Sequence, residues 1–169
     1  NRPVKFVQGN MEVECGYDYM DRRWFKKVKQ NGVVTVHECY LYRDYLQIAA
    51  LDMLQNATVK HVILWDSSEP IATRPLALLT RGEMYMYGFD FGKIVTELLD
   101  DQGQSVASYD YTPYGAVATN GEQASSNPLQ WSSEVWDEDL GMSYYNYRYL
   151  NSLDGRWTSR DSLEEKEKL

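Results

Sequence analysis

Short runs in which apolar and polar residues alternate recur along this chain, and turn-forming residues separate them. Successive side chains of a strand point to opposite faces of a sheet, so such runs predict half-buried β-strands. Residues 22–29 and 33–42 flank Gln30-Asn31-Gly32, and an Asn-Gly step between β-rich runs predicts a hairpin. A second hairpin is predicted in the same way, from residues 94–99 and 105–111 around the turn 100–104.

Aromatic residues follow the same alternation. Tyr145, Tyr147 and Tyr149 would share one face of an extended strand, and a turn at 154–155 follows them. A second aromatic strand face is predicted from Tyr85, Tyr87, Phe89 and Phe91. Such stripes predict packed cross-strand ladders, and stacking on sugar rings is the alternative.

Other segments lack this alternation. Residues 67–75 and 120–128 are rich in turn formers and predict loops, the second of them flexible and polar. Residues 161–169 predict a short helix, with Asp161 as its N-cap. The apolar residues of 44–55 have helical spacing, so a helix is one reading of that segment.

The amino-acid composition of the chain disfavours several classes of function. The chain has 169 residues, of which 43% are hydrophobic, which suits one domain or a fragment of a larger shell. Its net charge of −8 disfavours nucleic acid and anionic membrane surfaces, because both require clustered Lys and Arg. No apolar run approaches the ~20 residues that cross a bilayer, so membrane insertion is not expected. The chain begins with neither Met nor a signal peptide, which suggests a processed or trimmed product.

Several motifs in a fixed order resemble Rhs/YD-repeat proteins. The C-terminal one is close to G-L-Y-Y-x-x-R-Y-Y-D-P-x-x-G-R-[FW]-x-x-x-D-P, the core signature of that family. The others resemble YD repeats and the family's N-P-F-R-F-S-G and D-x-E-T-G-L motifs. The matching segments are 16–23, 85–95, 109–117, 127–133, 136–142 and 141–161.

The resemblance implies a mainly β fold, with antiparallel YD-type hairpins in a curved sheet or partial shell. It implies strands from Leu46 to Leu51 and from Thr58 to Trp65, with a turn between them, in place of the helix. In that family the shell encloses a C-terminal polypeptide. The expected organisation is a single domain, 1–169, with N-terminal hairpins (1–80), YD-type repeats (81–120), the core signature (121–169) and a short C-terminal helix.

The family resemblance also implies a peptidase site. Many members release the enclosed polypeptide with two aspartates, which map here to Asn151 and Asp161. An amide cannot exchange a proton in the required range, so this pair is broken unless Asp154 replaces Asn151. Two nearby carboxyl groups can share one proton and hydrolyse a peptide.

Arg148 or Arg156 would then hold one carboxylate ionised or stabilise an oxyanion. The alternative is structural, with Asp161 capping the helix and Asp154 forming the turn. The family's Pro is Ser162 here and its final glycines are missing, so proteolysis would act in trans.

Other candidate sites are weaker. The acidic pairs and triplets at 100–101 and 137–139 predict solvated turns more than cation sites. His37 and His61 have no metal-ligand spacing with the cysteines, and no dinucleotide motif occurs, so neither a metal nor a cofactor is expected. Cys15 and Cys39 are equally compatible with a disulfide and with two separate thiols.

Two functions therefore remain. The first is an aspartic-type endopeptidase, a hydrolase of Rhs-core type that cleaves a protein or glycoprotein substrate in trans. The second is a non-catalytic shell or extracellular module that binds protein or glycan and has a decayed autoprotease site.

Exposed strand edges and an exposed aromatic concave face favour a homodimer. The family resemblance implies a secreted or cell-surface bacterial protein.

Overall fold

The fold is built from antiparallel strands that pair in chain order. The computed structural model describes residues 2–68 and 74–159. Within these ranges, eleven strands form one sheet and four more form a second sheet. The first sheet contains β1 (Lys5–Gln8), β2 (Met11–Tyr17), β3 (Arg23–Gln30), β4 (Val33–Arg43), β5 (Leu46–Asp52), β6 (Thr58–Trp65), β7 (Pro75–Thr80), β8 (Glu83–Phe89), β9 (Val95–Leu99), β10 (Ser105–Tyr111) and β11 (Val117–Asn120).

The second sheet follows in the C-terminal part of the chain. It contains β12 (Val135–Asp137), β13 (Met142–Tyr145), β14 (Arg148–Asn151) and β15 (Arg156–Trp157). The helical segments among the described residues are three 3₁₀ turns, η1 (Met53–Gln55), η2 (Ala124–Ser126) and η3 (Trp131–Ser133). The mainly β fold predicted from the sequence is therefore confirmed, whereas the expected helix at 161–169 lies outside the described residues.

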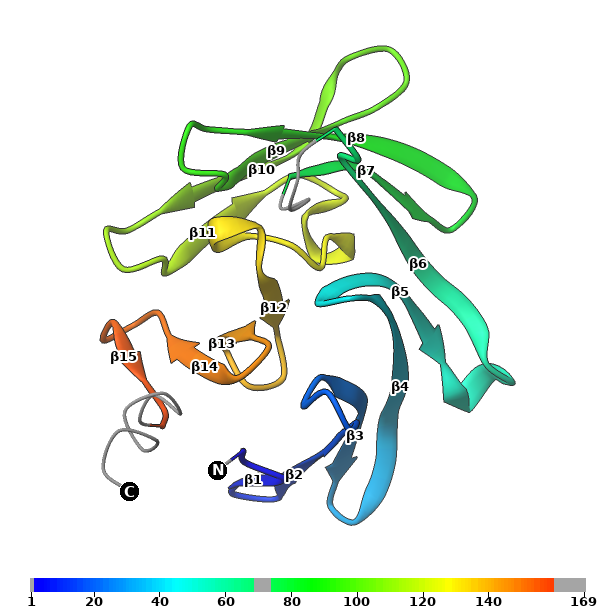
Figure 1. Ribbon diagram of the computed structural model, residues 1–169, viewed down its shortest axis with the longest axis vertical. Coiled ribbons are helices and arrows are strands. Elements are labelled where there is room, and N and C mark those ends of the chain that lie inside the picture. The colour runs from blue at the N-terminus through cyan, green and yellow to red at the C-terminus, as the bar shows by residue number, and fades with distance from the viewer. Residues whose placement is uncertain (1, 69–73, 160–169) are drawn as a thin grey trace.

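The large sheet curls into an open arc, with the C-terminal sheet lying in its opening (Figure 1). Register shifts interrupt most of its strand pairings, for example between Gly16 and Tyr17 and between Gly88 and Phe89. Such bulges bend a strand and increase its twist, which accounts for the curvature. The segment after β11 crosses the concave side of the arc, and β12 to β15 end near the N-terminal strands (Figure 1).

The YD-type repeats share one turn geometry. Asp18 Oδ1 accepts hydrogen bonds from the backbone N–H groups of Met20 and Arg22, and Asp90 Oδ1 does the same with Gly92 and Ile94. A carboxylate that accepts local N–H groups stabilises a turn. In these two repeats the Asp residue therefore closes the hairpin loop, which is a structural role that requires no chemistry. In the third repeat, 109–117, Thr112 takes this place, because its Oγ1 accepts the backbone N–H of Ala116.

The interior has two apolar regions. The larger lies under β6 to β10 and includes Ile63, Leu78, Tyr87 and Leu98, and the smaller surrounds Val13 and Val28 on β2 and β3. Buried polar side chains lie between these regions, on β3 to β6. This polar middle of the arc is where the C-terminal segment makes its contacts.

Most of the hairpins predicted from the sequence are confirmed. The Asn31-Gly32 turn joins β3 to β4, and the turn at 100–104 joins β9 to β10. The helical reading of 44–55 is wrong, because β5 and η1 occupy this segment. Gln47 and Ala49, two residues apart on β5, are both buried, as expected where a strand presents one face to the interior.

The prediction for the three C-terminal tyrosines is wrong. Asn146 has a positive φ of 43° and turns the chain between β13 and β14, so the residues do not lie on one strand. Tyr149 is buried, whereas Tyr147 is exposed. A positive φ is tolerated by Asn better than by most residues, which permits this tight turn.

The prediction of a second aromatic strand face, at residues 85–91, is only partly confirmed. Tyr85 and Tyr87 on β8 are buried in the larger apolar region, but Phe91 lies beyond the end of β8 and is fully exposed. The bulge at Gly88 and the turn at Asp90 break the alternation. The buried tyrosines also contradict the expectation of an exposed aromatic concave face.

The segment 120–128 is not the flexible loop expected from its composition. It contains η2, and both Ala124 and Asn127 are buried. Asn127 accepts a hydrogen bond from Tyr87 and donates one to the backbone of Leu129. These contacts fix the segment against the concave face of the large sheet.

Cys15 and Cys39 are free thiols. Cys15 lies opposite Lys26 and Cys39 lies opposite the adjacent residue Phe25, so β3 separates the two cysteines. Neighbouring strands are about 4.8 Å apart, which places the two Cα atoms beyond the ~7 Å limit for a disulfide. Because adjacent residues face opposite sides of a strand, the thiols also lie on opposite faces of the sheet.

Candidate functional site: a buried ionic cluster and an adjoining cavity

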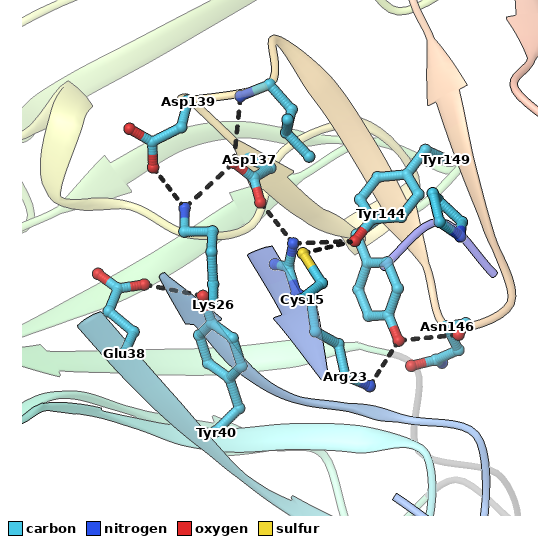
Figure 2. Close-up of polar contacts among 12 residues, drawn as sticks. Cys15, Arg23, Lys26, Glu38, Tyr40, Asp137, Asp139, Tyr144, Asn146 and Tyr149 are labelled. Carbon is cyan, nitrogen blue, oxygen red and sulfur yellow. Dashed lines mark hydrogen bonds and ion pairs between the residues drawn. The ribbon is translucent and has the colours of Figure 1, made fainter. Parts of the chain in front are cut away.

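The polar middle of the arc is centred on Arg23, at the start of β3. Its side chain is 1% exposed, and Nη1 donates to Asp137 Oδ2 at 2.5 Å. Asp137 ends β12, so this ion pair joins the two sheets (Figure 2). Nη1 also donates to Tyr149 Oη at 3.2 Å, on β14.

Aromatic rings surround the guanidinium group of Arg23. Its Cζ lies 4.6 Å from the centre of the Tyr144 ring and 5.0 Å from that of Tyr40. The backbone N–H of Arg23 donates to Tyr144 Oη at 2.8 Å, and Tyr144 in turn donates to the backbone oxygen of Asn146 (Figure 2). A cation over an aromatic face is stabilised, and more strongly where water is excluded.

Lys26 completes the cluster from the same strand. Its Nζ donates to Asp137 Oδ1 at 3.1 Å and to Asp139 Oδ2 at 2.6 Å (Figure 2). Asp137 Oδ1 also accepts the backbone N–H of Leu140 at 3.3 Å. The fully buried Asp137 carboxylate is therefore held by two cations and a backbone donor, as a buried charge requires.

Opposing effects act on the pKa of Asp137. Burial alone would raise the pKa of its carboxyl, but attraction to Arg23 and Lys26 outweighs burial and lowers it. Burial likewise opposes the charged form of Lys26, yet the neighbouring Asp137 raises the pKa of Lys26. Both groups are thus held in their charged forms, and neither is poised to exchange a proton near neutral pH.

A second charged pair lies beside the first. Glu38 on β4 accepts hydrogen bonds from Tyr40 at 2.8 Å and from Lys60 Nζ at 2.5 Å. Burial would raise the pKa of Glu38, but Lys26 and Lys60 lower it. His61 lies further along this face, and burial together with Lys60 lowers its pKa to about 4, so its ring is neutral at pH 7.

A cavity of about 230 Å³ adjoins this cluster. The large sheet contributes Glu38, Gln47 and His61 to its lining, and the segment that crosses the concave side contributes Ser126, Gln130 and Trp136. The side chains that form it are thus drawn from distant parts of the chain.

The residues of the predicted peptidase site that the structure describes lie outside this cluster. Asn151 and Asp154 each cap a local turn, by accepting the backbone N–H of Leu153 and of Arg156. The guanidinium of Arg148 lies 4.1 Å from the centre of the Trp157 ring. Asp161 lies outside the described residues, so the carboxylate pair stays a prediction.

Sequence reasoning missed the residues that form the cluster. Arg23 and Asp137 belong to motifs that were recognised only as signs of the family, and residues 137–139 were expected to form a solvated turn. That expectation is wrong for Asp137, whereas Asp100 does form an exposed turn. The D-x-E-T-G-L motif was the available signal, since its first Asp is the buried residue.

The described residues form neither a metal cluster nor a membrane-spanning helix. They contain no group of His, Cys, Asp and Glu side chains that could hold a metal ion. Within the same ranges, no helix has the length and apolar character needed to cross a membrane. The cluster is instead arranged to bind the C-terminal sheet to the large sheet.

Comparison with known proteins supports the fold. No protein-family model matches the chain. The chain is 29% identical over 177 residues to Salivary gland surface protein 1 of Aedes aegypti, covering 96% of this chain and 5% of that protein.

Two solved structures superpose over most of the chain. TcdB2-TccC3 without its hypervariable C-terminal region gives a TM-score of 0.67 at 22% identity, over 95% of this chain and 8% of that one. The Photorhabdus luminescens Tc holotoxin pore gives a TM-score of 0.65 at 18% identity, over 94% of this chain and 8% of that one. At these identities the likeness is one of fold, and this chain spans less than a tenth of each protein.

Proposed function

Because the chain has the fold of an Rhs/YD-repeat shell, we propose that it is a wall segment of a larger β-shell and acts as a scaffold that encloses polypeptide. The chain matches only a small part of the proteins that it resembles, as expected of one segment of a long wall. The mosquito relative is named a surface protein, which supports a secreted or cell-surface location. A bacterial source stays a prediction.

The buried Arg23–Asp137 pair is the observation that carries this proposal. A shell wall must hold its curvature against solvent on the convex side and cargo on the concave side. The pair fastens β12 to β3 across the arc, and Tyr144 and Tyr149 extend the contact. A cluster whose charges are all mutually paired stabilises a shape and leaves no free acid or base for catalysis.

The scaffold role is tested by hydrogen exchange on the purified chain. Amides of β3 to β5 should exchange slowly in the unmodified chain and at least tenfold faster in Asp137→Asn, because the C-terminal sheet loses its attachment. Asp139→Asn is the matched control, since its carboxylate is partly exposed and binds only one member of the cluster. Equal exchange in all three proteins would contradict the proposal.

The shell itself is tested by electron microscopy of the chain together with its flanking sequence. A hollow particle with this segment in its wall supports enclosure. An isolated domain with solvent on both faces of the large sheet contradicts it.

A peptidase that cleaves other proteins in trans is the alternative function, and it depends on Asp161 and Asp154. It is tested by incubating a casein substrate with the unmodified chain, Asp161→Asn and Asp154→Asn. The Asn side chain can still accept the Arg156 N–H, so the second variant should keep its turn. Acid-favoured cleavage that either variant abolishes would replace the scaffold proposal with the peptidase.

Self-association is a further part of the proposal. β1 and β11 are the outer strands of the large sheet and offer unpaired backbone groups. Sedimentation of the isolated chain should detect a homodimer, whereas a monomer at all concentrations would contradict it.

A further inference from the structure

The cavity beside the ionic cluster has the features of a binding site. Its volume of about 230 Å³ is far above the ~10–15 Å³ that holds one water molecule, and slightly below the ~300 Å³ at which drug-sized sites begin. It therefore suits a small molecule of about the size of one sugar ring. Its lining comes from both the large sheet and the crossing segment, so it exists only in the folded chain.

Every charge in the lining except that of the exposed Glu138 is already neutralised by the protein. Lys60 is paired with Glu38, and both Arg23 and Lys26 are paired with Asp137. The neutral ring of His61 adds no charge at pH 7. A charged ligand would have to compete with these internal pairs, so the lining favours a neutral one.

Uncharged polar groups in the same lining have no partner. Gln47 and Gln130 are each only 4% exposed, and the Oε1 atom of each has no hydrogen-bond partner among the described residues. The Oγ atom of Ser126 is likewise unpartnered. Gln47 Nε2 lies 3.4 Å from His61 Nε2, so the amide nitrogen is engaged while its oxygen remains available.

These atoms define what a ligand must supply. An amide oxygen only accepts hydrogen bonds, whereas a hydroxyl both donates and accepts. A buried acceptor that stays unmatched destabilises the folded chain, so a ligand that donates to both glutamines is favoured. Tyr40 and Trp136 add aromatic surface to the lining, which can cover the apolar side of a ring.

We propose that this cavity binds a neutral, polyhydroxylated molecule of monosaccharide size. Hydroxyl groups of the ligand donate to Gln47 Oε1 and Gln130 Oε1, and the Ser126 hydroxyl exchanges hydrogen bonds with a third. The shell proposal does not require this binding, and the isolated chain suffices to test it.

The test is saturation-transfer NMR and calorimetric titration of the 169-residue chain with glucose, galactose and mannose. At least one sugar should bind saturably, and Gln47→Met and Gln130→Met should each weaken that binding at least tenfold. Methionine keeps the length of the side chain but removes the acceptor. Both variants should fold, because each removes a buried amide oxygen that has no partner, and Gln47→Met gives up in addition only the long 3.4 Å contact with His61.

Gln123→Met is the matched control. Gln123 Oε1 is also unpartnered, but Gln123 does not line the cavity, so this variant should bind sugar as the unmodified chain does. The proposal is overturned if no sugar binds, if only acetamide or glycylglycine binds, or if the two cavity variants bind sugar as tightly as the control.

Discussion

Arg23 and Asp137 lie 114 positions apart and form an ion pair in which both side chains are almost completely buried. The pair connects the third strand of the large sheet to the first strand of the C-terminal sheet. Opposite charges in such a place are stable only as partners, because neither has water to solvate it. The attachment of the C-terminal sheet to the large sheet therefore depends on two residues that lie far apart in the chain.

Removal of the Asp137 charge should destabilise the protein strongly. Asp137→Asn leaves Arg23 buried without its ion-pair partner, whereas Lys26 keeps Asp139, and breaking a buried pair typically costs about 3–5 kcal/mol. Urea denaturation followed by tryptophan fluorescence measures the loss. A change as small as that of Asp139→Asn would show that the pair adds no stability.

The Asp137 carboxylate should also account for part of the loss of stability at low pH. The pKa of Asp137 is lower in the folded state than its ordinary value of 3.8, so its stabilising effect is complete above about pH 4. That effect is lost as the pH falls through the folded pKa. The free energy of unfolding should therefore decrease less in Asp137→Asn than in the unmodified chain when the pH is lowered from 5 to 2.

The stability of the protein should also depend on pH through Glu134. This dependence is opposite in sign to that of Asp137 and lies nearer to neutral pH. Burial raises its pKa from 4.5 to about 7, so the folded chain keeps a proton that the unfolded chain releases. Stability should fall as the pH rises from about 4.5 to 7, and Glu134→Gln should remove a penalty of about 2–3 kcal/mol at pH 8. Melting temperatures at pH 5 and pH 8 measure the effect, with the exposed Glu138→Gln as control.

Two hairpin turns predict a reciprocal pair of substitutions. Asn31-Gly32 and Arg81-Gly82 both form two-residue loops with positive φ at each residue. Asn tolerates this conformation better than Arg, so Arg81→Asn should stabilise the protein by up to about 1 kcal/mol. Asn31→Arg should destabilise it by a similar amount. If Arg81→Asn instead lowered the melting temperature and Asn31→Arg raised it, other contacts of these side chains would outweigh the effect of the turn conformation.

The cysteines should behave as independent thiols. Because β3 separates Cys15 from Cys39, oxidation cannot join them within one folded chain. The melting temperature should be the same with and without reductant, and denatured protein should release two titratable thiols. Recovery of fewer than two from freshly oxidised monomer would contradict the strand order.

The sequence by itself determined the strands and many of the turns. Alternation between the two faces of a strand is local, and so are the turn-forming residues at Asn31-Gly32 and at 100–104. The tight turn at Asn146 was missed because an alternating Tyr pattern looks the same whether or not a single residue reverses the chain.

Only the tertiary structure decided which polar residues are buried. The D-x-E-T-G-L motif marks the position of Asp137 but not its burial, because burial of a carboxylate depends on cations supplied by β3 from the other end of the sequence. The same holds for Gln47 and Gln130, which share one cavity only after the crossing segment packs against the arc. Whether two charged side chains form an ion pair depends on their distance in space, and the order of residues along the chain does not give that distance.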